Sequence, residues 1–170
     1  GINIMFWGAM NRMENEDAVM YFINEIWPNV NKENVKFYIV GSNPSAEVKK
    51  LESKNIVVTG FVEDPKEVFE KMDISIVPLR LGAGVKIKVL ESLAAGLPVL
   101  TTDVGAEGIM VENRRDILIE NNPKEFAESL NKLIVDKEKR YIISSNGKRV
   151  IQKHYFKGYN SEVLKSILIK

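Results

Sequence analysis

The sequence predicts an α/β domain of three layers, in which helices cover both faces of a doubly wound, Rossmann-like parallel sheet. Apolar runs of strand length alternate with stretches of helical period along the chain, which is the pattern of successive βαβ units. The chain has 170 residues, of which 45% are hydrophobic, and this is enough for one core of ordinary size. It carries no internal repeat and no low-complexity segment.

The individual elements follow from the spacing of apolar residues and from residues that begin or end helices. Strands are expected at residues 2–7, 35–40, 56–59, 74–79, 98–102 and 117–119. Helices are expected at residues 18–27, 45–53, 65–72, 86–95, 123–136, 137–154 and 159–169. Pro28 ends the first helix, Asp64 and Pro65 are the preferred N-cap and first residue of the third, and Gly96 is a typical cap at the end of the fourth.

Composition and charge exclude several classes of function. The 24 Lys and Arg residues against 23 Asp and Glu give a net charge of +1, without the basic excess of a nucleic-acid binder. The absence of cysteine excludes disulfides and thiolate metal sites, and the single histidine, His154, excludes a His-rich metal cage. No apolar stretch reaches the roughly 18 residues that span a bilayer.

The first residues look like an internal segment of a longer protein rather than a natural N-terminus. A strand of buried type begins at the second residue, without an initiator Met and without the charged segment of a signal peptide. We therefore expect a domain of a longer chain. The alternative is a processed natural N-terminus.

Ligand binding is expected at one edge of the predicted sheet. In open α/β sheets ligands bind in the crevice at the carboxyl ends of the strands, where loops and helix N-termini converge. Four loops meet this condition, at residues 8–15, 41–44, 60–64 and 80–86.

The last of these loops carries the strongest chemical signal. Gly82 and Gly84 have no Cβ atom, so a ligand can approach their backbone, and the helix start that follows attracts phosphate. Lys86 and Lys88 lie in the first turn, where the helix dipole disfavours cations, and this indicates an external anion. The alternative is a tight turn with two surface lysines. The glycine spacing matches neither a P-loop nor the dinucleotide-binding fingerprint.

Glu91 lies one turn beyond Lys88 among apolar positions. An ionised carboxylate accepts two hydrogen bonds at once, which suits the two hydroxyls of a ribose. The alternative is an ion pair with Lys88 on the same helix, and the spacing alone does not choose between the two.

The stretch from Pro78 to Gly108 resembles the donor-binding domain of GT-B fold glycosyltransferases, the group that contains the large retaining family four (glycosyl transferases group 1). The matching residues are Glu91, the Ala-Ala-Gly-Leu-Pro-Val segment at 94–99 and the Thr-Asp-Val-Gly-Ala-Glu-Gly segment at 102–108. A subgroup of the family writes the preceding loop as Gly-x-Gly-x-(Lys/Arg)-x-Lys, as at residues 82–88. The similarity covers nearly the whole chain and implies one half of a GT-B architecture.

The resemblance implies a role for the residues at these positions. Glu91 would hold the nucleotide ribose, while Lys86 and Lys88, with Gly84, would hold the diphosphate, and the two lysines and Glu91 would form the catalytic set. Further donor-binding residues implied by position are Gly8, Arg12, Gly41, Phe61, Val62, Arg80, Gly82, Ala83 and Val85.

Within this set, the backbone around Phe61 and Val62 would frame the base, and Gly8 with Arg12 would close over the phosphates. One position departs from the family pattern, because the first Glu of the family's pair of glutamates falls on Ala83. In the family that carboxylate lies near the donor sugar, so its role in sugar recognition does not carry over to this chain.

The implied reaction is transfer of a sugar from a nucleoside-diphosphate sugar to an acceptor hydroxyl, with retention, in glycan or polysaccharide biosynthesis. The lysines would stabilise the negative charge that develops on the leaving diphosphate, and no cofactor or metal is expected. Residues 1–170 would form a single donor-binding domain that binds nucleotide but does not turn over alone, because the acceptor site belongs to an N-terminal domain absent from this chain. Two alternatives stay open: a GT-B nucleotide-sugar epimerase, and a degenerate docking module.

The expected partners are the nucleotide sugar and the acceptor-binding domain of the same protein, with no nucleic acid. The absence of an export signal and of cysteine, together with a nucleotide-linked donor, predicts a cytoplasmic protein. The acceptor domain could bring it to the inner face of the membrane.

Overall fold

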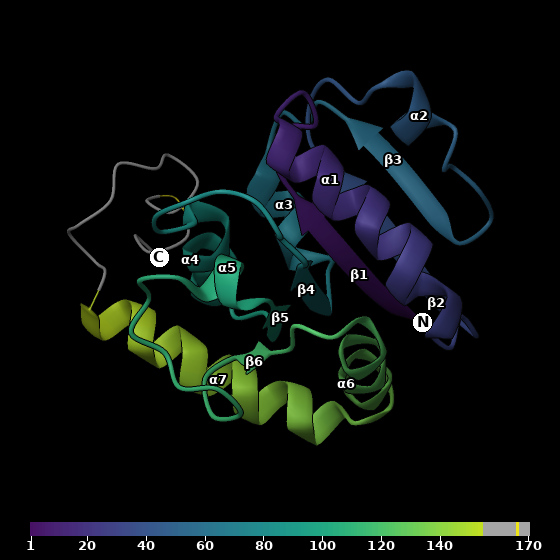
Figure 1. Ribbon diagram of the computed structural model, residues 1–170. Coiled ribbons are helices and arrows are strands. Elements are labelled where there is room, and N and C mark those ends of the chain that lie inside the picture. Colours follow the sequence, from purple (N-terminus) through teal and green to yellow (C-terminus); the bar gives the residue numbers. More distant parts are fainter. Residues whose placement is uncertain (155–165, 167–170) are drawn as a thin grey trace.

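A six-stranded parallel sheet forms the centre of the molecule (Figure 1). The computed structural model describes residues 1–154 and Ser166. The strands are β1 (Ile2–Trp7), β2 (Val35–Val40), β3 (Ile56–Gly60), β4 (Ile74–Val77), β5 (Val99–Thr101) and β6 (Leu118–Ile119). Their order across the sheet is β3-β2-β1-β4-β5-β6, and every neighbouring pair is parallel. This is the doubly wound order that the sequence predicts.

Helices follow the strands in the expected alternation. They are α1 (Met13–Tyr21), α2 (Ala46–Lys49), α3 (Pro65–Glu70), α4 (Ile87–Ala94), α5 (Asp103–Ala106), α6 (Pro123–Val135) and α7 (Lys137–His154). A π-helical turn (Phe22–Ile26) and a 3₁₀ turn (Trp27–Asn29) extend α1. Asp64 caps α3 by accepting a hydrogen bond from the Lys66 amide, with Pro65 as the first helical residue, as the sequence predicts.

The sheet is packed on both faces, as the alternation of side chains along β1 demands. Ile4 and Phe6 belong to the larger core, in which Phe22, Phe37 and Phe126 pack together. Met5 and Trp7 point to the other face, where a smaller cluster forms around Phe69 and Met72. The three-layer arrangement is therefore confirmed, with apolar side chains packed on both faces of the sheet.

Several predicted boundaries are wrong. The first helix begins at Met13 rather than at residue 18, since its first turn carries Glu14 and Glu16, which suit a helix N-terminus but interrupt the apolar period. The second helix spans only four residues, because Ser45 is its N-cap and the chain tightens after Lys49 into a turn in which the Leu51 amide donates to the Val48 carbonyl. The strands expected at 74–79 and 98–102 end sooner, at Val77 and Thr101. The helix expected at residues 159–169 lies outside the described residues.

One helix was not expected at all. No helix is among those expected from the sequence at residues 102–108, but Asp103–Ala106 form the short helix α5, and the Thr102 hydroxyl caps it by accepting from the Gly105 amide. Gly105 is required there because a Cβ atom would collide with the Thr101 hydroxyl. This helix brings the residues after it next to the loop between β4 and α4.

The strand order fixes where a ligand can enter. The chain runs outward from β1 to β2 and β3, and then returns to place β4 on the other side of β1. The loops that follow β1 and β4 therefore separate toward opposite faces and leave a crevice between the carboxyl ends of these two strands. Figure 1 shows both strands at the middle of the sheet, with α1 and α4 following them.

Candidate functional site

A cleft of about 570 Å³ lies at this crevice. Its walls come from the end of β1, the start of α1, the loop after β4 and the first turns of α4. It is lined by Trp7, Gly8, Ala9, Arg12, Glu14, Asn15, Leu79, Gly82, Ala83, Val85, Lys86, Ile87, Lys88 and Glu91. Both lysines and the glutamate singled out from the sequence therefore face one space.

Lys88 is the most perturbed cation of the cleft. Its ammonium group donates a hydrogen bond to Asn15 Oδ1 at 2.7 Å and lies 5.0 Å from the centre of the Phe6 ring. Burial lowers the pKa of Lys88 from 10.5 to about 8, against the opposing charges of Glu91 and Glu14. A charged ammonium group that is largely desolvated is stabilised when an anion enters the cleft and pairs with it.

Glu91 is held in the cleft wall by a residue that the sequence analysis did not include in the site. The Trp7 indole N–H donates to Glu91 Oε1 at 3.1 Å, and Glu91 is only 6% exposed. Trp7 in turn packs edge-on against Phe69, with ring centres 5.5 Å apart. Trp7 therefore has two roles, because it packs against Phe69 and its indole also positions the carboxylate.

The loop between β4 and α4 takes a shape that requires its glycines. Gly82 and Gly84 have φ values of 109° and 83°, which residues with a side chain rarely adopt. Lys86 is the N-cap of α4 rather than a residue of its first turn, and its ammonium group folds back to donate to the Gly84 carbonyl at 2.6 Å. Lys88 does lie in the first turn, as predicted.

An acidic side chain from the turn after α5 also reaches this loop. Glu107 accepts a hydrogen bond from the Gly84 amide at 2.5 Å, and its carboxylate lies 3.6 Å from the Lys86 ammonium group. Gly84 and Glu107 are 23 residues apart, so no local pattern in the sequence indicates this contact.

The glycine that follows β1 is needed because the cleft is narrow at this point. A Cβ atom on Gly8 would overlap the Lys88 ammonium group and lie 2.7 Å from Asn15 Nδ2. Gly41, with φ 147°, lies so close to Gly8 that a Cβ atom on it would overlap the Gly8 carbonyl oxygen. Arg12 stands at the mouth of the cleft, mostly exposed, and pairs with Glu14 at 2.8 Å.

The predicted site residues thus divide into two groups. Those that line the cleft are Gly8, Arg12, Gly82, Ala83, Val85, Lys86, Lys88 and Glu91. Gly41, Phe61, Val62, Gly84 and Arg80 do not line it. Phe61 is 78% exposed directly after β3, while Gly84 contributes its amide to the Glu107 contact.

Arg80 is engaged away from the cleft. Its guanidinium binds Asp17 with two hydrogen bonds, at 2.7 and 3.1 Å, and stacks 4.3 Å from the centre of the Tyr21 ring. Asp17 raises the pKa of Arg80, so this cation stays charged and paired. In this arrangement Arg80 ties the loop after β4 to helix α1.

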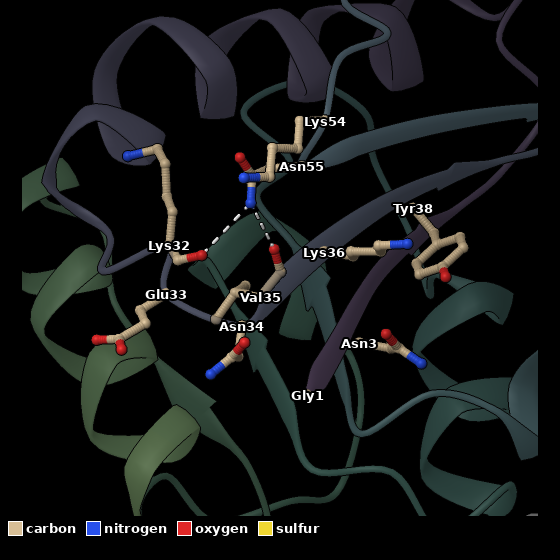
Figure 2. Close-up of a pocket in the computed structure, with 10 residues that line it drawn as sticks. All are labelled: Gly1, Asn3, Lys32, Glu33, Asn34, Val35, Lys36, Tyr38, Lys54 and Asn55. Atoms are coloured by element: carbon tan, nitrogen blue, oxygen red, sulfur yellow. Dashed lines mark hydrogen bonds between the residues drawn. The ribbon is translucent and has the colours of Figure 1, made fainter.

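A second hollow, of about 780 Å³, lies at the opposite edge of the sheet (Figure 2). Two of its polar side chains already hydrogen-bond to backbone carbonyls. Asn55 Nδ2 donates to the Lys32 and Val35 carbonyls, and Lys32 Nζ donates to the Trp27 carbonyl at 2.5 Å. Figure 2 shows the Lys32 and Lys36 ammonium groups pointing in different directions. Because its charges do not converge and it lies at the amino ends of the strands, we place the candidate site in the cleft.

Two further findings concern only the part of the chain that the structure describes. It contains no group of three or more His, Cys, Asp or Glu side chains arranged to hold a metal ion. It also contains no helix long and apolar enough to cross a membrane. His154 is exposed at the end of α7, where it lines a separate hollow with Arg115 and Arg149.

Comparison with known families agrees with the fold. Residues 1–136 match the family described as Glycosyl transferases group 1, so the chain belongs to this family. The resemblance predicted from residues 78–108 is thereby confirmed.

Two curated bacterial proteins show clear sequence similarity. One is an uncharacterized 44.6 kDa protein of the cps region of Klebsiella pneumoniae, 28% identical over 139 residues, which cover 75% of this chain and 36% of the relative. The other is the capsular polysaccharide biosynthesis glycosyltransferase CapM of Staphylococcus aureus, 27% identical over 131 residues, which cover 72% of this chain and 34% of the relative. The chain thus spans about a third of the length of each.

Solved structures share the fold at low sequence identity. The C-terminal domain of the glycosyl transferase group 1 family protein LpcC from Francisella tularensis superposes with a TM-score of 0.68 at 19% identity, covering 91% of this chain and 86% of that one. HepE from Anabaena, solved with UDP-glucose, superposes with a TM-score of 0.74 at 16% identity, covering 99% of this chain and 47% of that one.

Proposed function

We propose that this chain is the donor-binding domain of a glycosyltransferase that moves a sugar from a nucleoside-diphosphate sugar to an acceptor hydroxyl in polysaccharide biosynthesis. The observation that carries the proposal is the convergence of Lys86, Lys88 and the buried Glu91 on one cleft at the switch point of the sheet. The family, and the name of CapM among its relatives, support the same reaction class.

The diphosphate would lie between the loop after β1 and the start of α4. Lys88 supplies a partly desolvated cation, Lys86 supplies a second at the N-cap, and the free amides at the helix start add their dipoles. During transfer, negative charge grows on the leaving diphosphate, and fixed cations in a cleft stabilise it without reorganisation. In this proposal the two lysines and the helix start carry this charge, and no metal is required.

The ribose would bind at Glu91. One carboxylate oxygen accepts from Trp7, and an ionised carboxylate has acceptor capacity beyond that bond. The indole fixes the carboxylate in one orientation, so a ribose hydroxyl meets a positioned acceptor. Phe61 and Val62 lie beside the third strand, and we keep them as candidates for framing the base.

The remaining elements of the reaction belong to the rest of the protein. We propose that an acceptor-binding domain precedes this one and completes the active site, that transfer proceeds with retention, and that the reaction uses the cytoplasmic pool of nucleotide sugar. Without that domain, residues 1–170 bind nucleotide but do not transfer sugar at the rate of the whole enzyme.

Isothermal titration of the chain with UDP, GDP and ADP tests the proposal. We expect saturable binding of at least one nucleotide, and loss of that binding in Glu91→Ala and Lys88→Ala, whose folding is checked by thermal unfolding. Substitution of the exposed Lys54, on the opposite edge, is the matched control and leaves binding unchanged. Absence of binding of all three nucleotides contradicts the proposal and favours a docking module.

A further inference from the structure

Glu107 contacts Lys86, which the proposed function assigns to the diphosphate, and the amide of Gly84, which the family resemblance assigns to it. Its carboxylate accepts from the Gly84 amide at 2.5 Å and lies 3.6 Å from the Lys86 ammonium group. A backbone amide beside an ammonium group is the donor set that binds a phosphate oxygen, and a carboxylate oxygen satisfies the same donors. An anion of the protein itself therefore competes for part of the cleft.

The contact is built to be exchangeable rather than permanent. Glu107 is about half exposed, at 51%, while the Lys86 side chain is 11% exposed, so the acid approaches a sheltered cation from the solvent side. An ion pair this open to water contributes little free energy. A diphosphate carries more negative charge than one carboxylate and meets Lys88 at the same time, so it outcompetes Glu107 for these donors.

The backbone on both sides of the contact allows the exchange. Gly84 and Gly108 both have positive φ values, 83° and 73°, so the loop before α4 and the turn after α5 each have a glycine next to the contact. Glu107 is the C-cap of α5, with non-helical backbone angles (φ −52°, ψ 128°), so its side chain is outside the regular helix and can rotate into solvent.

We propose that Glu107 is an affinity-determining residue of the donor site, a displaceable carboxylate that holds Gly84 and Lys86 until the nucleotide diphosphate replaces it. This inference rests on the proposed function, because it takes the diphosphate to be the competing anion. It predicts that binding of the nucleotide includes the cost of displacing Glu107. Removing the carboxylate then strengthens nucleotide binding, whereas a residue that only positions the loop would weaken binding when removed.

Titration of the wild-type chain, Glu107→Gln and Glu112→Gln with UDP, GDP and ADP tests this inference. Glu112 is a matched control, since it is a 63% exposed acid paired with Arg115 at 2.8 Å, outside the cleft, and its substitution changes the net charge equally. We expect Glu107→Gln to bind about three- to tenfold more tightly than the wild type, and Glu112→Gln to bind with wild-type affinity. Glu107→Asp keeps the charge but shortens the side chain, and we expect a smaller gain.

Hydrogen exchange at the Gly84 amide gives a second measurement that does not depend on affinity. In the free protein this amide exchanges faster in Glu107→Gln than in the wild type, and saturation with nucleotide restores protection in both. Nucleotide binding by the wild type that is unchanged or weaker in Glu107→Gln overturns the inference and leaves the proposed function intact. Failure of both chains to bind any nucleotide overturns the proposed function, and the inference with it.

Discussion

Lys88 is expected to lower the stability of the free domain while serving its nucleotide site. Its replacement by methionine should therefore change stability and binding in opposite directions. Methionine is unbranched and of similar length, so it fills the same space without a charge. We expect Lys88→Met to raise the free energy of unfolding of the free domain at pH 7 and, at the same time, to abolish nucleotide binding.

The magnitude follows from the pKa of Lys88 and from its hydrogen bond. Burial lowers this pKa from 10.5 to about 8, and each tenfold change in a protonation constant is worth about 1.4 kcal/mol, so keeping the charged form in the cleft costs about 3 kcal/mol. The substitution also leaves Asn15 Oδ1 without the ammonium donor, which costs about 1–2 kcal/mol. The net gain expected at pH 7 is about 1–2 kcal/mol.

The pH dependence of this gain identifies its cause. The pKa of Lys88 is lower in the folded than in the unfolded chain, so between pH 8 and 10.5 the unfolded chain binds more protons and the stability contribution of Lys88 rises with pH. Lys88→Met lacks this contribution, so its advantage shrinks through the same window and reverses by about pH 10.5.

Urea denaturation of the wild type, Lys88→Met and the exposed-lysine control Lys54→Met, at pH 7 and at pH 10.5, measures these differences. We expect the control to follow the wild type at both pH values. A Lys88→Met variant that is less stable than the wild type at pH 7, or an advantage that persists unchanged to pH 10.5, would refute the reasoning that burial sets this pKa.

Other parts of the structure give further expectations. Glu91→Gln should weaken UDP binding by about tenfold or more but leave pyrophosphate binding unchanged in titrations, because the carboxylate serves the ribose; equal losses for both ligands would contradict this role. Above pH 8 nucleotide affinity should fall as free Lys88 loses its proton, and a profile that stays flat from pH 8 to 10 would contradict this role of Lys88. Gly8→Ala should weaken nucleotide binding at least tenfold by titration, since its Cβ atom would displace the ammonium group. Gly147→Ala, whose Cβ atom would lie 2.7 Å from the Asp116 carbonyl oxygen, should lower the free energy of unfolding by about 1–3 kcal/mol in urea, despite the helix propensity of alanine.

The fold could be predicted from the sequence because the patterns that indicate its strands and helices each lie within a short stretch of the chain. Alternating apolar runs predicted six strands and the parallel sheet, and the Asp64-Pro65 pair predicted the start of α3. The prediction failed where the local signal was weak: α1 begins in an acidic, polar turn, and α5 is four residues long and contains Gly105. In both cases tertiary packing, rather than periodicity, defines the helix.

The candidate site was predictable only in part, for a related reason. Lys86, Lys88 and Glu91 lie on one short segment, so their common placement follows from the helix period and the rule for strand ends. The partners that tune them are distant in the chain: Asn15 is 73 residues from Lys88, and Trp7 is 84 residues from Glu91. Such contacts exist only once the order of strands brings β1 beside β4, and a single sequence carries no direct signal of them.

The position of the diphosphate is the central claim, and a crystal structure of the chain soaked with the nucleotide it binds tests it most directly. We predict both phosphate groups in the cleft between Gly8 and the start of α4, within hydrogen-bond distance of the Lys86 and Lys88 ammonium groups, with a ribose hydroxyl on Glu91. A nucleotide bound in the hollow at the amino ends of the strands, or in the cleft with its phosphates away from both lysines, would contradict the account.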